Sequence, residues 1–207
     1  FMSQRAQDRM EKKEDKGKDI GLTNMRIREI TFEKDGSVLI SAEEYYMVVR
    51  HDSKTNMTYY DHHYKDILIA KIDKNGELAF WKKMPKYQYA GGTSSPVYRG
   101  GMGYRLVDTQ KYYYFMFLDN VKNLELALNK PPVKHQDGYG GFLTAYQVDK
   151  ATGEVKKLSI LDTRDAKGYN LYQFNTERIV MISDNVMAIE AYIKKKQDMM
   201  VSVTIKE

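Results

Sequence analysis

The sequence contains no cysteine, only four prolines and a single tryptophan. Without cysteine the chain has no disulfide framework and no cysteine-based zinc or thiol chemistry. The lack of cysteine does not indicate the cellular compartment. No apolar run approaches the ~20 residues of a membrane-spanning helix, and no signal peptide is visible. The chain begins with Phe1 rather than Met, so we expect a cleaved or truncated piece. The lack of a signal peptide therefore does not argue for the cytoplasm.

Motifs of catalysis and cofactor binding are missing as well. The chain has neither a Gly-x-Ser-x-Gly elbow nor a His-Glu-x-x-His helix. The glycine-rich stretches Arg99–Tyr104 and Gly138–Gly141 do not join a strand to a helix, the context that gives glycine loops their affinity for phosphate. His62 and His63 are neighbours on a predicted strand, so they point to opposite faces and cannot easily share a metal ion. The sequence predicts no catalytic residue, cofactor or metal site.

Charge is mixed rather than one-sided. The 33 basic and 28 acidic residues give a net charge of +5 and are spread along the chain. A nucleic-acid footprint would be clustered on one face. We therefore expect a solvated surface of both signs and no nucleic-acid partner.

What the sequence does contain is a hairpin pattern written twice, in residues 66–81 and 141–161. Each copy is a β-rich run, an acidic residue, a turn with glycine, a glutamate and a second β-rich run. Glycine supplies the positive φ that such turns need. A third copy begins at residues 198–205 and stops before the turn, and 17 tyrosines favour strands throughout.

The strand pattern around these hairpins divides the chain into similar units. We predict a charged helix or linker over residues 1–22, followed by three four-stranded antiparallel meanders at about 25–86, 97–165 and 169–207. Such units stack as the blades of a β-propeller. The fold class is therefore all-β, a propeller-like array with a short N-terminal helix. The last blade lacks its outer strand, and we expect polypeptide upstream of Phe1 to supply it.

Five short segments carry a resemblance to a known group of proteins. They are Ala42–Tyr46, His63–Ile67, Leu118–Asn123, Ser183–Val186 and Glu190–Tyr192. With the basic stretch before the first strand, they resemble uncharacterised propeller-like proteins that Gram-negative bacteria of gut and soil export. The resemblance covers nearly the whole chain and corresponds to the C-terminal portion of those proteins. It implies an extracytoplasmic location and an upstream segment, but no activity.

An acidic residue recurs near the end of the second strand of each unit: Glu43, Asp119 and Glu190. These acids could ring a channel and bind a cation or a basic peptide. Alternatively, each one caps a turn or pairs with a lysine or arginine of a neighbouring blade.

The stretch from Tyr45 to Tyr64 is too long for a blade strand alone and predicts a projecting hairpin. It concentrates residue types that are enriched in protein interfaces. These candidate partner-binding residues are Tyr45, Tyr46, Met47, Tyr59, Tyr60 and Tyr64. The alternative is that the rings only cover the base of the hairpin.

Two classes of function follow. The first is a non-enzymatic interaction or scaffold module of the bacterial cell envelope, with an envelope protein as its partner. The second is a ligand binder or hydrolase whose site lies in the propeller channel and is completed by a missing N-terminal half. The lack of any nucleophile or metal constellation favours the first.

Overall fold

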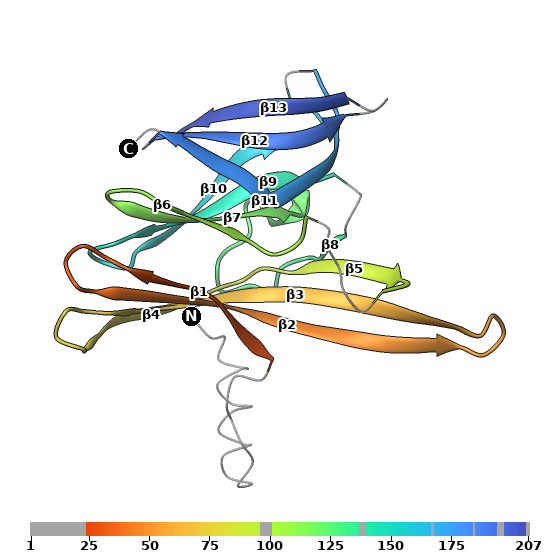
Figure 1. The fold of residues 1–207 in the computed structure, drawn as a ribbon, viewed down its shortest axis with the longest axis horizontal. Helices are drawn as coiled ribbons and strands as arrows, with labels where there is room; N and C mark the ends of the chain where they lie inside the picture. Colours follow the sequence, from red (N-terminus) through yellow and green to blue (C-terminus); the bar gives the residue numbers. More distant parts are fainter. Residues whose placement is uncertain are drawn as a thin grey trace, which may run out of the picture.

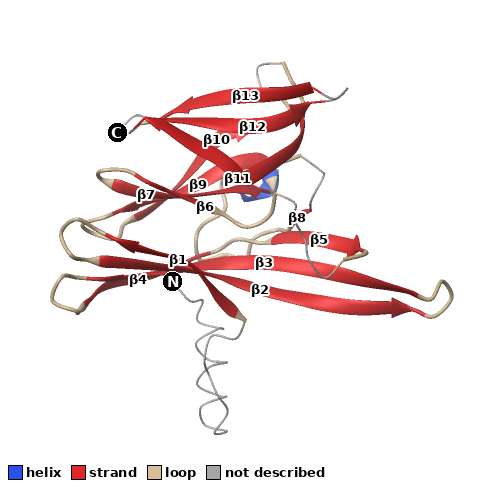
Figure 2. Ribbon diagram, viewed as in Figure 1, coloured by secondary structure: helices blue, strands red, loops and turns tan. Residues whose placement is uncertain are grey.

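The computed structural model describes residues 24–95, 101–136, 140–166, 168–183, 185–193 and 197–205. This part of the chain consists of strands and turns, with one short 3-10 helix, η1, at Val121–Asn123 (Figure 2). The prediction of an all-β fold is confirmed. The helix predicted over residues 1–22 lies outside the described residues. No helix in the described part is long and apolar enough to cross a membrane.

The first sheet contains the predicted antiparallel meander. Its four strands are β1 (Met25–Phe32), β2 (Val38–Asp52), β3 (Met57–Ile72) and β4 (Leu78–Met84). The β1–β2 and β3–β4 turns contain Gly36 and Gly76, each with φ of 86°, a conformation that favours glycine. Asp73 stabilises the second turn by accepting hydrogen bonds from the amides of Asn75 and Glu77.

Two further strands widen this sheet where no strand was predicted. They are β5 (Gln88–Thr93) and β8 (His135–Gln136). β5 pairs with β3 beyond the end of β4, and β8 adds to β5 in parallel. One half of the long β3 strand is therefore paired with β4 and the other half with β5.

The second sheet is also an antiparallel meander, in the order β10-β9-β7-β6. Its strands are β6 (Arg105–Asp108), β7 (Tyr112–Asp119), β9 (Phe142–Asp149) and β10 (Val155–Asp162). The β9–β10 turn places Gly153 at φ of 68°, as the repeated hairpin pattern predicts.

The third sheet has three antiparallel strands. They are β11 (Leu171–Ser183), β12 (Val186–Ile193) and β13 (Gln197–Thr204). Within the described residues β13 pairs only with β12, so its other edge is open there. The predicted fourth strand stays a prediction.

The three sheets lie one above another in layers, with the second in the middle (Figure 1). One apolar cluster joins the first sheet to the second, and another joins the second to the third. β7 contributes to both because neighbouring side chains on a strand point to opposite faces. Its residues in the first cluster are Tyr113, Phe115 and Phe117, and those in the second are Tyr114, Met116 and Leu118.

The central place of β7 predicts a large cost for truncating one of its rings. Phe115 is fully buried, so Phe115→Ala should lower the free energy of unfolding by about 3–5 kcal/mol. Phe32→Ala is the matched control, because Phe32 is 79% exposed and should lose little. Urea unfolding of both variants measures the difference. Equal losses would contradict the assignment of β7 as the core of the stack.

Candidate functional site

The β2–β3 hairpin extends beyond the rest of the layered body (Figure 1). Its distal part pairs in continuous register from Tyr45 opposite Tyr64 to Asp52 opposite Met57, after an irregularity that follows Glu43. At the tip, the Asp52 carboxylate accepts a hydrogen bond from the amide of Lys54. The predicted hairpin over residues 45–64 therefore exists, but β5 and β8 broaden its base.

The inner face of the hairpin is part of the core. Tyr64 is buried in a small cluster with Ala90 and Met102, and Tyr45 packs against it. The Tyr45 hydroxyl lies 2.8 Å from Nδ1 of His62, whose side chain is also buried. Burial raises the pKa of Tyr64 to about 12. These rings hold the hairpin onto the body.

The outer face carries four neighbouring rings, which we call the aromatic ladder: Tyr46, His63, Tyr87 and Tyr89. Tyr46 and His63 stack with ring centroids 4.5 Å apart. The ring of His63 also lies 5.1 Å from Tyr89 and 6.0 Å from Tyr87. Burial lowers the pKa of His63, which favours the neutral ring in the ladder.

Lysines flank the ladder. The Lys65 ammonium lies 5.4 Å from the centre of the Tyr46 ring, and that of Lys134 lies 4.5 Å from the centre of the Tyr89 ring. Both distances are within cation–π range. The outer face of the hairpin therefore offers aromatic faces beside positive charge.

An ion pair fixes the hairpin relative to β5. Arg50 binds both carboxylate oxygens of Asp61, with Nε to Oδ2 at 2.6 Å and Nη2 to Oδ1 at 2.9 Å. The amide of Gly92, on β5, donates to the same carboxylate at 2.8 Å. The hydrogen bonds from Arg50 are the main reason that the pKa of Asp61 is lowered to about 2. The carboxylate is therefore charged at neutral pH and holds the ladder strands together.

Apolar side chains continue this outer face across the four-stranded part of the sheet. Directly opposed residues on paired strands share a face, and two complete rows are apolar. We call them the outer apolar rows: Ile30, Ile40, Ala70 and Trp81, and Phe32, Val38, Ile72 and Leu78. Trp81 is 51% exposed and Ile30 49%. No described part of the chain covers these residues to the degree seen in the core.

The six predicted partner-binding residues divide between the two faces of the hairpin. Tyr46 and Tyr59 lie on the outer face, opposite His63 and Arg50. The other four lie on the inner face with the buried His62: Tyr45, Met47, Tyr60 and Tyr64.

Sequence reasoning missed Tyr87, Tyr89 and Trp81 as surface residues. The alternation of tyrosines at positions 87 and 89 was a strand signal, but Pro85 and the Gly91–Gly92 pair suggested a loop.

The three recurring acids each pair with a base of their own sheet. Oδ2 of Asp119 lies 2.7 Å from Nζ of Lys157, and Oε1 of Glu190 lies 2.7 Å from Nη1 of Arg178. Glu43 pairs with Lys86. The bases do not come from a neighbouring sheet. Among the described residues, no group of three His, Asp or Glu side chains is arranged to hold a metal ion.

The Glu43–Lys86 pair is the most buried of the three. Lys86 Nζ lies 2.7 Å from Glu43 Oε1, and both side chains are at most 1% exposed. The contact is a close ion pair rather than a well-aligned hydrogen bond. Lys86 also donates to Oε1 of Gln88, whose amide nitrogen donates to the carbonyl of Leu118 on β7. The pair therefore lies where the first two sheets meet.

No protein-family model, no curated protein and no solved structure matches the chain.

The buried pair predicts an asymmetry between single and double substitutions. Glu43→Gln leaves the Lys86 ammonium buried without a counter-charge, so the free energy of unfolding should fall by about 3–5 kcal/mol. Burial already lowers the pKa of Lys86, which shows that the charged form is disfavoured there. Adding Lys86→Met should recover most of the loss. Chemical denaturation of the three proteins tests this, and a double variant less stable than Glu43→Gln would contradict it.

Proposed function

We propose that the chain is a non-enzymatic protein-interaction module, which binds a partner protein through the outer face of its first sheet. The single observation that carries the proposal is the aromatic ladder, continuous with the outer apolar rows on one face. Exposed apolar faces of this kind, bordered by polar groups, mark interaction sites. Tyrosine and tryptophan are the residue types that dominate binding energy in such sites.

The partner that fits this face is a protein with an apolar β-sheet surface. The opposite face of the same sheet already packs against a sheet, through Leu39, Ile67 and Ile69. The outer apolar rows use the same residue types, with tryptophan and phenylalanine at their ends. A second sheet layer would therefore bury them in the same way. The lysines beside the ladder favour acidic side chains at the edge of that layer.

The test is a site-specific cross-link in the cells that produce the chain. A photoreactive benzoylphenylalanine replaces Tyr46 or Trp81, and replaces Lys156 in the control, whose side chain on β10 is 64% exposed. We expect one partner protein, from the cell-envelope fraction, to be cross-linked from positions 46 and 81 and not from 156. A cross-link to a second copy of the chain, or the same products from all three positions, would contradict the proposal.

Tyr46→Ala and Trp81→Ala should each weaken binding of that partner by about 2 kcal/mol or more while the melting temperature changes little. Tyr64→Ala is the comparison variant. It should lower the melting temperature because Tyr64 is buried.

We further propose that the three sheets are consecutive blades of a β-propeller outside the cytoplasm, and that a fourth strand from another part of the assembly pairs with β13. Two sheets contain four-stranded meanders and the third has three strands, and open edges are normally covered in native proteins. The proposed location outside the cytoplasm rests on the sequence resemblance.

Hydrogen exchange of the β13 amides tests whether a fourth strand covers the open edge. Ile205 donates its amide to Asn185, and in an antiparallel pair the amides that point to the partner alternate with those that point away. Those facing the open edge are Asp198, Met200, Ser202 and Thr204. These amides should exchange rapidly in the purified chain and slowly in the assembly isolated from the cells that produce it. Rapid exchange in both would contradict the fourth strand.

A further inference from the structure

His63 lies at the centre of the aromatic ladder, beside all three of its tyrosine rings. It stacks on Tyr46 of β2, and its Nδ1 lies 3.2 Å from the hydroxyl of Tyr87. The ring of Tyr89 on β5 is its third neighbour. His63 is only partly buried. A partner that covers the ladder therefore also covers this imidazole.

The acidic groups beside His63 already have basic partners. Asp61 lies two residues before it on the same face of β3, and its carboxylate is bound by two nitrogens of Arg50. Lys65 lies two residues after it on that face, and Glu44 pairs with this lysine at 3.5 Å. A proton on His63 therefore adds a positive charge to a group of side chains in which both acids are already paired.

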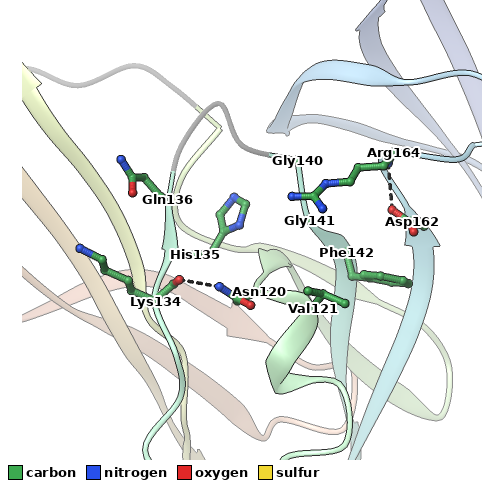
Figure 3. Close-up of a pocket in the computed structure, with 10 residues that line it drawn as sticks. All are labelled: Asn120, Val121, Lys134, His135, Gln136, Gly140, Gly141, Phe142, Asp162 and Arg164. Atoms are coloured by element: carbon green, nitrogen blue, oxygen red, sulfur yellow. Dashed lines mark hydrogen bonds between the residues drawn. The ribbon is translucent and has the colours of Figure 1, made fainter.

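Lys134, just before β8, brings a further positive charge to the ladder. Its carbonyl accepts a hydrogen bond from the side-chain amide of Asn120 at 2.8 Å, and its side chain points away from the ring of His135 (Figure 3). Its ammonium consequently lies over Tyr89. The titratable and charged groups around His63 are, element by element, Glu44, Tyr46 and Arg50 on β2, Asp61, His62 and Lys65 on β3, Tyr87 before β5, Tyr89 on β5 and Lys134 before β8.

These surroundings favour the neutral imidazole. Burial is the main cause of the lowered pKa of His63, and Asp61 opposes it. The charges of Lys65 and Lys134 lower the pKa further. A partner that removes water from the ring acts in the same direction, because burying a charge without a counter-charge is costly. The pKa of His63 is therefore lower in the complex than in the free chain, so the neutral form binds more tightly.

We propose that His63 makes partner binding pH-dependent: the outer face binds its protein partner while the imidazole is neutral and releases it when acid protonates the ring. This dependence rests on the proposed function, since it requires a partner that covers the ladder. Among the ladder residues, only histidine changes its charge near neutral pH.

The size of the effect follows from the neutral fraction of the ring. When only that fraction binds, the apparent dissociation constant is the intrinsic one divided by the fraction. One pH unit above the pKa of the free ring nearly all molecules are neutral, and one unit below it about one in eleven is. Between these two pH values, the amount of partner needed for half-saturation should rise about tenfold.

The test combines a titration with a cross-link. Nuclear magnetic resonance of the His63 imidazole in the free chain gives its pKa and thereby sets the two pH values. Benzoylphenylalanine at position 81, which leaves the ladder rings unchanged, then captures the partner from a dilution series of the cell-envelope fraction at each pH. We expect half-maximal cross-linking to require about tenfold more of the fraction at the lower pH.

His63→Phe is the decisive variant, because phenylalanine keeps an aromatic ring in the ladder and cannot take up a proton. Its ratio between the two pH values should be about tenfold smaller than that of the parent, even where the partner has a pH dependence of its own. His51→Phe is the matched control. His51 is exposed near the tip of the hairpin, so this variant should keep the ratio of the parent.

Three results would overturn the pH dependence and leave the proposed function intact. They are equal ratios in the parent and in His63→Phe, tighter binding by the parent at the lower pH, and an imidazole that stays neutral down to the pH at which the chain unfolds. A lack of any cross-link at either pH would overturn the proposed function and this inference with it.

Discussion

The burial of β7 on both faces is the constraint on which the rest of the structure depends. A strand between two sheets needs bulky side chains at consecutive positions, and residues 112–119 supply them. The tyrosines add a second requirement, because a buried hydroxyl needs a partner. Tyr113 donates to Glu33 at 2.5 Å, and Gln147 donates to the Tyr114 hydroxyl at 2.9 Å. Glu33 also pairs with Lys150, so one carboxylate links β7 to turns of two sheets.

Most of the strand arrangement could be predicted because it is local. Each hairpin carries its turn residues in its own sequence, as at Gly76 and Gly153, and strands that are consecutive in the chain pair with each other. β5 and β8 could not be predicted from such signals. β8 has only two residues, and it pairs with β5, which lies more than forty residues earlier in the chain. Its position depends on the path of the intervening loop, where Asn123 holds the backbone of Val133 through two hydrogen bonds.

The recurring acids show how a real sequence pattern can have a structural cause. Glu43, Asp119 and Glu190 were visible as a repeat, but their basic partners were not, because Lys86 lies 43 positions from Glu43 and Lys157 lies 38 from Asp119. A buried ion pair gives little net stability compared with an apolar pair. It does impose a single arrangement, since any other packing would bury one charge alone. The Glu43–Lys86 pair can therefore fix how the connection between β4 and β5 packs against β2.

The surroundings of the aromatic ladder could not be predicted from the sequence, because Lys134 beside Tyr89 and the buried His135 both depend on where β8 lies. Neighbouring residues on a strand point to opposite faces. Lys134 consequently lies over Tyr89 on the outer surface, while the next residue, His135, is buried. β8 is held to β5 by the amide of His135 and the carbonyl of Tyr87. Lys134 beside the ladder and the buried His135 are thus positioned by one backbone contact, and a displacement of β8 along β5 would move both.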